Sequence, residues 1–151
     1  MKRGLQITLA VLMLLSLVTV PLQAAQADDS GDCGYGTVSW TFTEADGTLT
    51  IEGSGDMVDY SCFEDGSGFQ DPPPWLAFQS KIKHIVIKDG VPRIGSDAFA
   101  RCEALSSIVI PDSVTSINMF AFKKCTGLKS VTIGKGVTDI QLEAFCDCTS
   151  L

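Results

Sequence analysis

The sequence has a single histidine, His84, and its neighbours Lys83 and Ile85 supply neither a nucleophile nor an orienting acid. Histidine is the commonest general base and a frequent zinc ligand. A chain with a single histidine is therefore poorly equipped for acid–base catalysis or zinc binding. The chain also lacks a nucleophile-elbow motif and the spaced acidic pattern of an EF-hand calcium loop. We therefore expect no enzyme activity, no metal site and no cofactor.

Basic residues are absent from residues 28–80, which contain eleven acidic residues and no Lys or Arg. Residues 81–151 contain nine basic and seven acidic residues. A segment without cations cannot neutralise the phosphates of a nucleic acid or of an anionic membrane. The sequence therefore predicts no nucleic-acid partner.

Long apolar runs are absent except at the N-terminus, where residues 5–20 carry no charge. Lys2 and Arg3 precede this run, Pro21 follows it, and Ala25-Gln26-Ala27 supplies small residues on either side of position 26. This is the pattern of a secretory signal peptide, and the run is shorter than the roughly 20 apolar residues of a membrane span. We expect cleavage after Ala27, a secreted or cell-surface location, and no membrane insertion after cleavage.

Residues 81–151 repeat with a period of 23. Strand-like triplets, a later isoleucine, an Ala-Phe pair, a cysteine and a leucine recur three times without a slip. A unit this small cannot bury its own apolar face, so three units must stack and share one core. The triplets alternate inward and outward as short strands do, and stacking places them in a narrow parallel sheet with one phenylalanine stack along its axis. The predicted fold is a repeat solenoid.

The residues of the predicted core share the inward repeat positions. They are Ile85, Ile87, Ile94, Phe99, Cys102, Leu105, Ile108, Ile110, Ile117, Phe122, Cys125, Leu128, Val131, Ile133, Ile140, Phe145, Cys148 and Leu151.

The segment Ile-Pro-Asp-Ser-Val-Thr-Ser-Ile at residues 110–117, followed by Ala-Phe, Cys-Thr and Leu, resembles the BspA-type leucine-rich repeat. Residues 47–57 and Pro74-Trp75 are similar to the lead-in of that family. The resemblance implies a bacterial surface or secreted protein, often an adhesin or a carrier of other modules. The family commonly has glycine where this chain has Gly95, Asn118 and Gln141. Glutamine tolerates a left-handed backbone poorly, so we expect a slightly distorted third coil.

Residues 28–80 are predicted to form a β-rich N-terminal cap. Val38, Trp40 and Phe42 alternate with polar residues, and Asp46-Gly47 is the turn signal of a hairpin. A solenoid needs a cap because its terminal coil otherwise exposes core to water. We expect Trp40 and Trp75 to cover the core at that end of the solenoid, and we expect them to pack in the core rather than bind a ligand.

The six cysteines of a secreted protein raise the question of disulfides. Cys102, Cys125 and Cys148 occupy one interior repeat position, where strand spacing does not suit a disulfide, so we expect buried free thiols. A bridge between Cys33 and Cys62 within the cap stays open. Cys146 aligns with Ala100 and Lys123, so we expect it to be exposed.

The outward strand positions form the candidate binding face. They are His84, Val86, Lys88, Ser107, Val109, Ser130 and Thr132. Their small, mildly apolar character suits a protein or a glycan, and it equally suits an ordinary solvated sheet. Three strands offer roughly 200–300 Å² of face, well below the 800 Å² per partner of a stable interface.

Two functions stay open: an extracellular protein-binding or adhesion module, and a structural spacer that displays another domain absent from this chain. Because Leu151 lies on a core position, we expect the repeat region at residues 81–151 to be truncated at its C-terminus.

Overall fold

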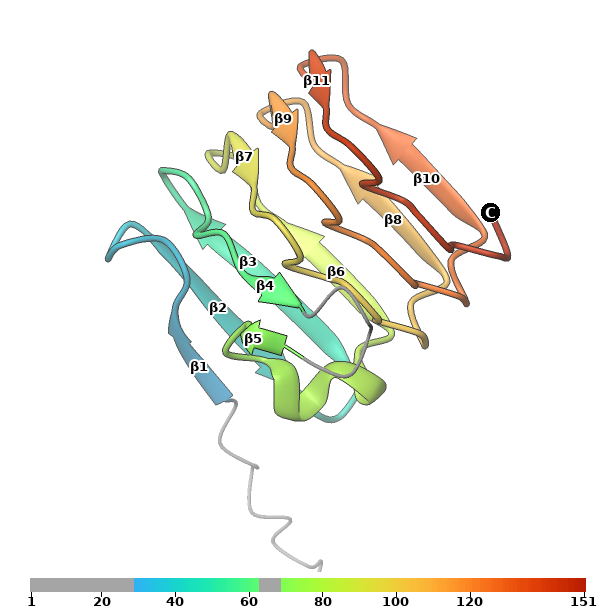
Figure 1. Cartoon of the computed structure of the whole chain (residues 1–151). Coiled ribbons are helices and arrows are strands. Elements are labelled where there is room, and N and C mark those ends of the chain that lie inside the picture. Colours follow the sequence, from blue (N-terminus) through green and yellow to red (C-terminus); the bar gives the residue numbers. More distant parts are fainter. Residues whose placement is uncertain (1–28, 63–68) are drawn as a thin grey trace, which may run out of the picture.

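The computed structural model describes residues 29–62 and 69–151, so the predicted signal peptide lies outside the described residues. Six longer strands follow one another along one side of the molecule (Figure 1). They are β1 (Asp29–Asp32), β2 (Val38–Thr43), β3 (Thr48–Gly53), β6 (His84–Ile87), β8 (Ser107–Ile110) and β10 (Ser130–Ile133). The remaining elements are β4 (Ser61–Cys62), β5 (Phe69–Asp71), the 3-10 helix η1 (Leu76–Lys81), β7 (Arg93–Ile94), β9 (Ser116–Ile117) and β11 (Asp139–Ile140). Among the described residues, no helix is long and apolar enough to cross a membrane.

The 23-residue period produces stacked coils with parallel strands, as predicted. β8 pairs with β10 so that Ser107 lies opposite Ser130, one period away. A second parallel sheet joins the short strands in the order β11-β9-β7 on the return side of each coil. Backbone bonds link the turns between them: Phe99 N–H donates to Ala121 O at 2.8 Å, and Phe122 N–H donates to Ala144 O at 2.7 Å. Each repeat of the sequence therefore forms the same backbone hydrogen bonds to the next repeat.

The segment before the repeats contains the predicted hairpin. β2 and β3 are antiparallel, and the inward positions of β2 are buried at every second residue. Gly47 has φ 73°, which suits glycine, and the Asp46 carboxylate accepts a bond from Thr48 N–H at 3.0 Å. The Asp-Gly turn predicted from the sequence is confirmed.

Strand β3 belongs to the stack as well as to the hairpin. It pairs in parallel with β6, with Leu49 opposite Ile85 and Ile51 opposite Ile87, a step of 36 residues rather than 23. The β4–β5 hairpin and η1 lie within this longer step (Figure 1). The segment predicted as a cap therefore supplies a complete additional coil in front of the three repeats.

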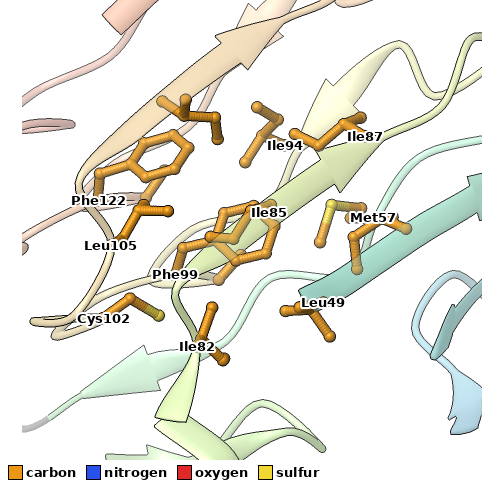
Figure 2. Close-up of a cluster of buried hydrophobic side chains, with 14 of the residues drawn as sticks. Leu49, Met57, Ile82, Ile85, Ile87, Ile94, Phe99, Cys102, Leu105 and Phe122 are labelled. Carbon is orange, nitrogen blue, oxygen red and sulfur yellow. The ribbon is translucent and has the colours of Figure 1, made fainter. Parts of the chain in front are cut away.

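A stack of aromatic rings runs along the core, as predicted from the repeated phenylalanine. Ring centroids lie 5.6 Å apart for Trp75 and Phe99, 5.3 Å for Phe99 and Phe122, and 5.1 Å for Phe122 and Phe145. Figure 2 shows Phe99 and Phe122 among Leu105, Ile94 and the other buried side chains. Trp75 heads the stack, is 1% exposed, and donates its ring N–H to Ala98 O at 2.9 Å. Trp75, and Trp40 at 6% exposed, are therefore core residues.

The predicted core residues of the first two repeats are buried, whereas the third repeat departs from the prediction. Ile133, Ile140 and Leu151 are exposed by 44%, 48% and 58%, and Val131 and Phe145 are half-buried. In the first two repeats the next coil covers the equivalent positions. Within residues 29–62 and 69–151, no segment packs on the far side of the third coil.

The predicted left-handed backbone at Gly95, Asn118 and Gln141 is wrong. Positive φ occurs two residues later in each coil, at Asp97 (52°), Phe120 (59°) and Glu143 (55°). Glycine at position 95 has another cause, because a Cβ there would lie 1.9 Å from Val58 O. Glycine is needed at position 95 because the neighbouring coil approaches too closely for a side chain, and not because of its backbone conformation.

The six cysteines are free thiols in the structure. Cys102, Cys125 and Cys148 are buried in one column, as predicted, and the Cys125 thiol donates to Phe99 O at 3.1 Å. Burial raises the pKa of Cys102 to about 12. Cys146 is half-buried rather than exposed.

The bridge considered between Cys33 and Cys62 is not formed. Cys33 is 2% exposed inside the core, and its burial raises its pKa to about 12. The Cys62 thiol instead donates to the Asp97 carboxylate at 2.9 Å. The two thiols therefore have separate surroundings.

Candidate binding face

The outward side chains of five strands form one continuous surface, which we call the strand face. Its members on β6, β8 and β10 are the predicted residues His84, Val86, Ser107, Val109, Ser130 and Thr132, and the predicted Lys88 follows β6 directly. All seven are exposed. The structure therefore brings the predicted set together on one surface, while their binding role stays a prediction.

Strands β2 and β3 extend this face beyond the predicted set. The register places Thr41 opposite Thr50, and Thr50 opposite Val86. Because the intervening residues are buried on the other side, these three side chains share the outer surface. Ser39, Thr43, Thr48 and Glu52 occupy the remaining outward positions of the two strands.

Sequence reasoning missed these residues because the step from β3 to β6 does not follow the 23-residue period. The alternation of Leu49-Thr50-Ile51 does match that of Ile85-Val86-Ile87. Matching the triplets without a fixed spacing would have identified the additional coil.

A groove lies on the strand face between β6 and β8. The two strands belong to separate hydrogen-bonded sheets, so the ladder is interrupted at this point. The groove has a volume of about 480 Å³, and its lining includes Val86, Val109, His84, Ser107 and Pro111. Val86 is 38% exposed and Val109 is 64% exposed, so the groove is aliphatic at its centre.

Charge is distributed unevenly along the strand face. At the β1–β3 end, Asp32 and Glu52 line an open hollow together with Lys88 and Asp89, which follow β6. At the opposite end, the exposed Lys129 precedes β10 and the exposed Lys135 follows it. Neither Lys129 nor Lys135 forms an ion pair with a described residue; the ion pairs join Lys81 to Glu44 and Arg93 to Asp56 and Asp59. The face is therefore acidic at one end and basic at the other.

The geometry at His84 does not resemble a catalytic site. His84 and Ser107 both line the groove, yet no hydrogen bond joins a described nucleophile to His84. The neighbouring Asp46 carboxylate accepts bonds from Thr48, and these hold the pKa of Asp46 below its usual value. Among the described residues, no group of three His, Cys, Asp or Glu side chains is placed to hold a metal ion.

A polar clamp fixes the additional coil to the repeats on the return side. The Asp59 carboxylate accepts bonds from Arg93 at 2.9 and 3.0 Å, from Ser96 N–H at 2.7 Å and from the Asn118 amide at 3.0 Å. Burial acts to raise the pKa of Asp59, but the Ser96 and Arg93 hydrogen bonds outweigh it and hold the pKa below its usual value. Asp59 thus touches two successive repeats and sets the position of β3 beside β6.

Comparisons with known proteins agree with this architecture. Residues 77–151 match the family model described as BspA type leucine-rich repeat region (6 copies). The structure is similar to the crystal structure of a leucine-rich repeat protein from Eubacterium ventriosum, with a TM-score of 0.63 and 28% sequence identity. That similarity covers 76% of this chain and 28% of the other, so this chain spans well under half of its solved relative. No curated protein matches the sequence.

Proposed function

Residues 77–151 are a BspA-type leucine-rich repeat region, and on this premise we propose that the chain is an extracellular protein-binding module. Its repeats form an elongated solenoid, and the strand face is its binding surface. Repeats of this family are typically non-enzymatic and suggest an interaction or scaffold module.

One observation carries the proposal: two neighbouring valines, Val86 and Val109, are exposed at the centre of the strand face. Single exposed valines are common, but here the two line one groove of about 480 Å³. When a partner covers both valines, their apolar surface is removed from water. This burial favours binding by roughly 25 cal/mol for each Å² of apolar surface buried.

The size of the strand face sets what it can bind. At about 4.8 Å per strand, five strands present roughly 350–500 Å², compared with about 800 Å² per partner in a stable interface. The five-strand face is larger than the three-strand face expected from the sequence, yet still below that value. We therefore expect weak, micromolar-range binding by this chain alone.

The binding role is tested by immobilising purified secreted and matrix proteins, together with a glycan array, and measuring binding by biolayer interferometry. We expect at least one protein to bind the wild-type chain and to lose affinity about tenfold or more for Val109→Glu, which buries a charge at the groove. Tyr35→Glu is the matched control, because Tyr35 is 82% exposed and lies in a turn outside the strand face. Equal binding of wild type and Val109→Glu would refute a role for the face.

A structural spacer is the second candidate, and the regular bonds between coils favour it. Arg101 N–H donates to Lys123 O at 2.6 Å, and Lys124 N–H donates to Cys146 O at 2.7 Å, so each coil is a template for the next. A spacer predicts no partner that depends on Val109. The same binding experiment therefore separates the two candidates.

The extracellular location rests on the predicted signal peptide and on the surface association of the family. We expect the exported protein to begin at Asp28. N-terminal sequencing of protein recovered from the medium or the cell surface tests this, and retention of Met1 would contradict it.

A further inference from the structure

The partner of the strand face can be described further from the chemistry of the face itself. This step rests on the proposed function, because it names the kind of segment that the same surface takes. Three features decide it: the side chains at the centre, the charges at the two ends, and the distance between those ends.

The centre of the face suits aliphatic protein side chains better than sugar rings. None of the outward positions of β2, β3, β6, β8 and β10 carries Phe, Tyr or Trp. Stacking of sugars needs an aromatic face, whereas Val86 and Val109 offer branched aliphatic surface over the groove. The groove therefore favours a polypeptide that contributes an aliphatic side chain.

The ends of the face differ in charge. Asp32 and Glu52 make the β1–β3 end acidic, and residues 28–80 contain no Lys or Arg to offset them. Lys83, Lys88 and Asp89 flank the central strand β6. Lys129 and Lys135 flank β10 without an ion-pair partner among the described residues. Asp112 lies near Lys135, since its carboxylate accepts the backbone N–H of Lys135 at 2.7 Å, but two lysines against one aspartate leave this end net positive. A complementary partner is thus basic over β2 and β3 and acidic over β10.

The two ends act independently. From β2 to β10 there are four strand spacings, a distance of about 19 Å. This is more than twice the Debye length of about 8 Å at physiological ionic strength, so a charge at one end is largely screened from the other. A partner segment with one type of charge therefore gains at one end and loses at the other.

From these features we infer that the strand face binds an extended polypeptide segment of opposite polarity lying across the strands. Its basic end covers β2 and β3, its aliphatic centre enters the groove at Val86 and Val109, and its acidic end covers β10. A segment of about six extended residues spans the 19 Å.

Three end-capped synthetic peptides with the same aliphatic centre test this by fluorescence anisotropy against the mature chain. One has lysines at one end and glutamates at the other, the second has glutamates at both ends, and the third has lysines at both ends. We expect the bipolar peptide to bind about three- to tenfold more tightly than either uniform peptide, and this preference to shrink as salt is raised.

Two protein variants reverse the preference. The double variant Lys129→Glu/Lys135→Glu makes both ends acidic and is expected to favour the peptide with lysines at both ends. The double variant Glu52→Lys/Asp89→Lys makes both ends basic and is expected to favour the peptide with glutamates at both ends. Lys124→Glu is the matched control, because Lys124 lies on the return side between β9 and β10 and its change leaves the preference unaltered. Circular dichroism confirms that each variant is folded.

The remaining outcomes overturn the inference. It is wrong if no peptide binds, if a uniform peptide binds wild type most tightly, or if Lys129→Glu/Lys135→Glu leaves the preference unchanged. If a protein from the binding panel nevertheless depends on Val109, the proposed function stands and only the polarity of the partner is refuted. Peptide binding that survives Val109→Glu would refute both.

Discussion

The replacement Phe122→Ala tests the aromatic stack that joins the coils. Phe122 is fully buried, and its ring lies 5.3 Å from that of Phe99 and 5.1 Å from that of Phe145, to which it is nearly parallel at 2°. Removing a buried phenylalanine ring costs about 3–5 kcal/mol through lost transfer energy and the cavity that is left. Since small domains have only about 5–15 kcal/mol of stability, this loss is a large fraction of the whole.

Urea unfolding followed by tryptophan fluorescence measures the loss, because Trp75 lies in the same stack. Phe145→Ala is the graded control: Phe145 is half-buried and stacks on Phe122 alone, so we expect roughly half the cost. Phe122→Leu keeps most of the volume, and we expect about 1–1.5 kcal/mol, which gives a value if the alanine variant does not fold. A cost below about 1 kcal/mol for Phe122→Ala, or an equal cost at the two positions, would refute the stacked core.

Three further predictions follow from other contacts. Gly95→Ala places a Cβ 1.9 Å from Val58 O and is expected to cost about 1–3 kcal/mol in urea unfolding, whereas Gln141→Ala at the equivalent repeat position costs little. Asp59→Asn removes a carboxylate whose pKa is lowered in the folded state, so the stabilisation exists above the unfolded pKa of about 3.9 and is lost as pH falls through the folded pKa. We expect a cost of about 1 kcal/mol at pH 7, kept small because the side chain is half-exposed, that shrinks as the pH is lowered below about 4 in parallel unfolding curves. Iodoacetamide at about pH 8 is expected to modify the half-buried Cys146 well before Cys102, whose burial raises its pKa to about 12, and equal rates in peptide mass mapping would count against the buried column.

The sequence was sufficient for the architecture of the repeats because each buried position recurs with the same spacing. It was insufficient for the first coil, since the β4–β5 hairpin and η1 lengthen that step to 36 residues and Trp75 takes the place of the repeated phenylalanine. The width of the strand face was underestimated for the same reason.

The backbone conformation of the turns on the return side of each coil could not be predicted from the sequence either. Phe120 and Glu143 adopt positive φ although neither residue type favours it, because the hydrogen bonds between neighbouring coils fix the turn. Conversely, Gly95 is required by the carbonyl of Val58 in the coil before it, a contact that no local pattern reveals. Both features depend on what lies one coil away.

The periodicity of the sequence predicted only part of the burial in the third coil. Ile133 and Ile140 occupy inward positions of the repeat, yet each is nearly half exposed. Periodicity identifies which side of a coil faces its neighbour, but burial also needs that neighbour to be present.

The central claim is that the strand face binds a polypeptide at Val86 and Val109. The most direct test is a methyl NMR titration of valine-labelled mature protein with the bipolar peptide. We predict that the methyl signals of the exposed Val86 and Val109 shift, while those of the fully buried Val91 and Val114 stay in place. Shifts confined to valines of the return side, or no shift at peptide concentrations that saturate the anisotropy signal, would contradict the account.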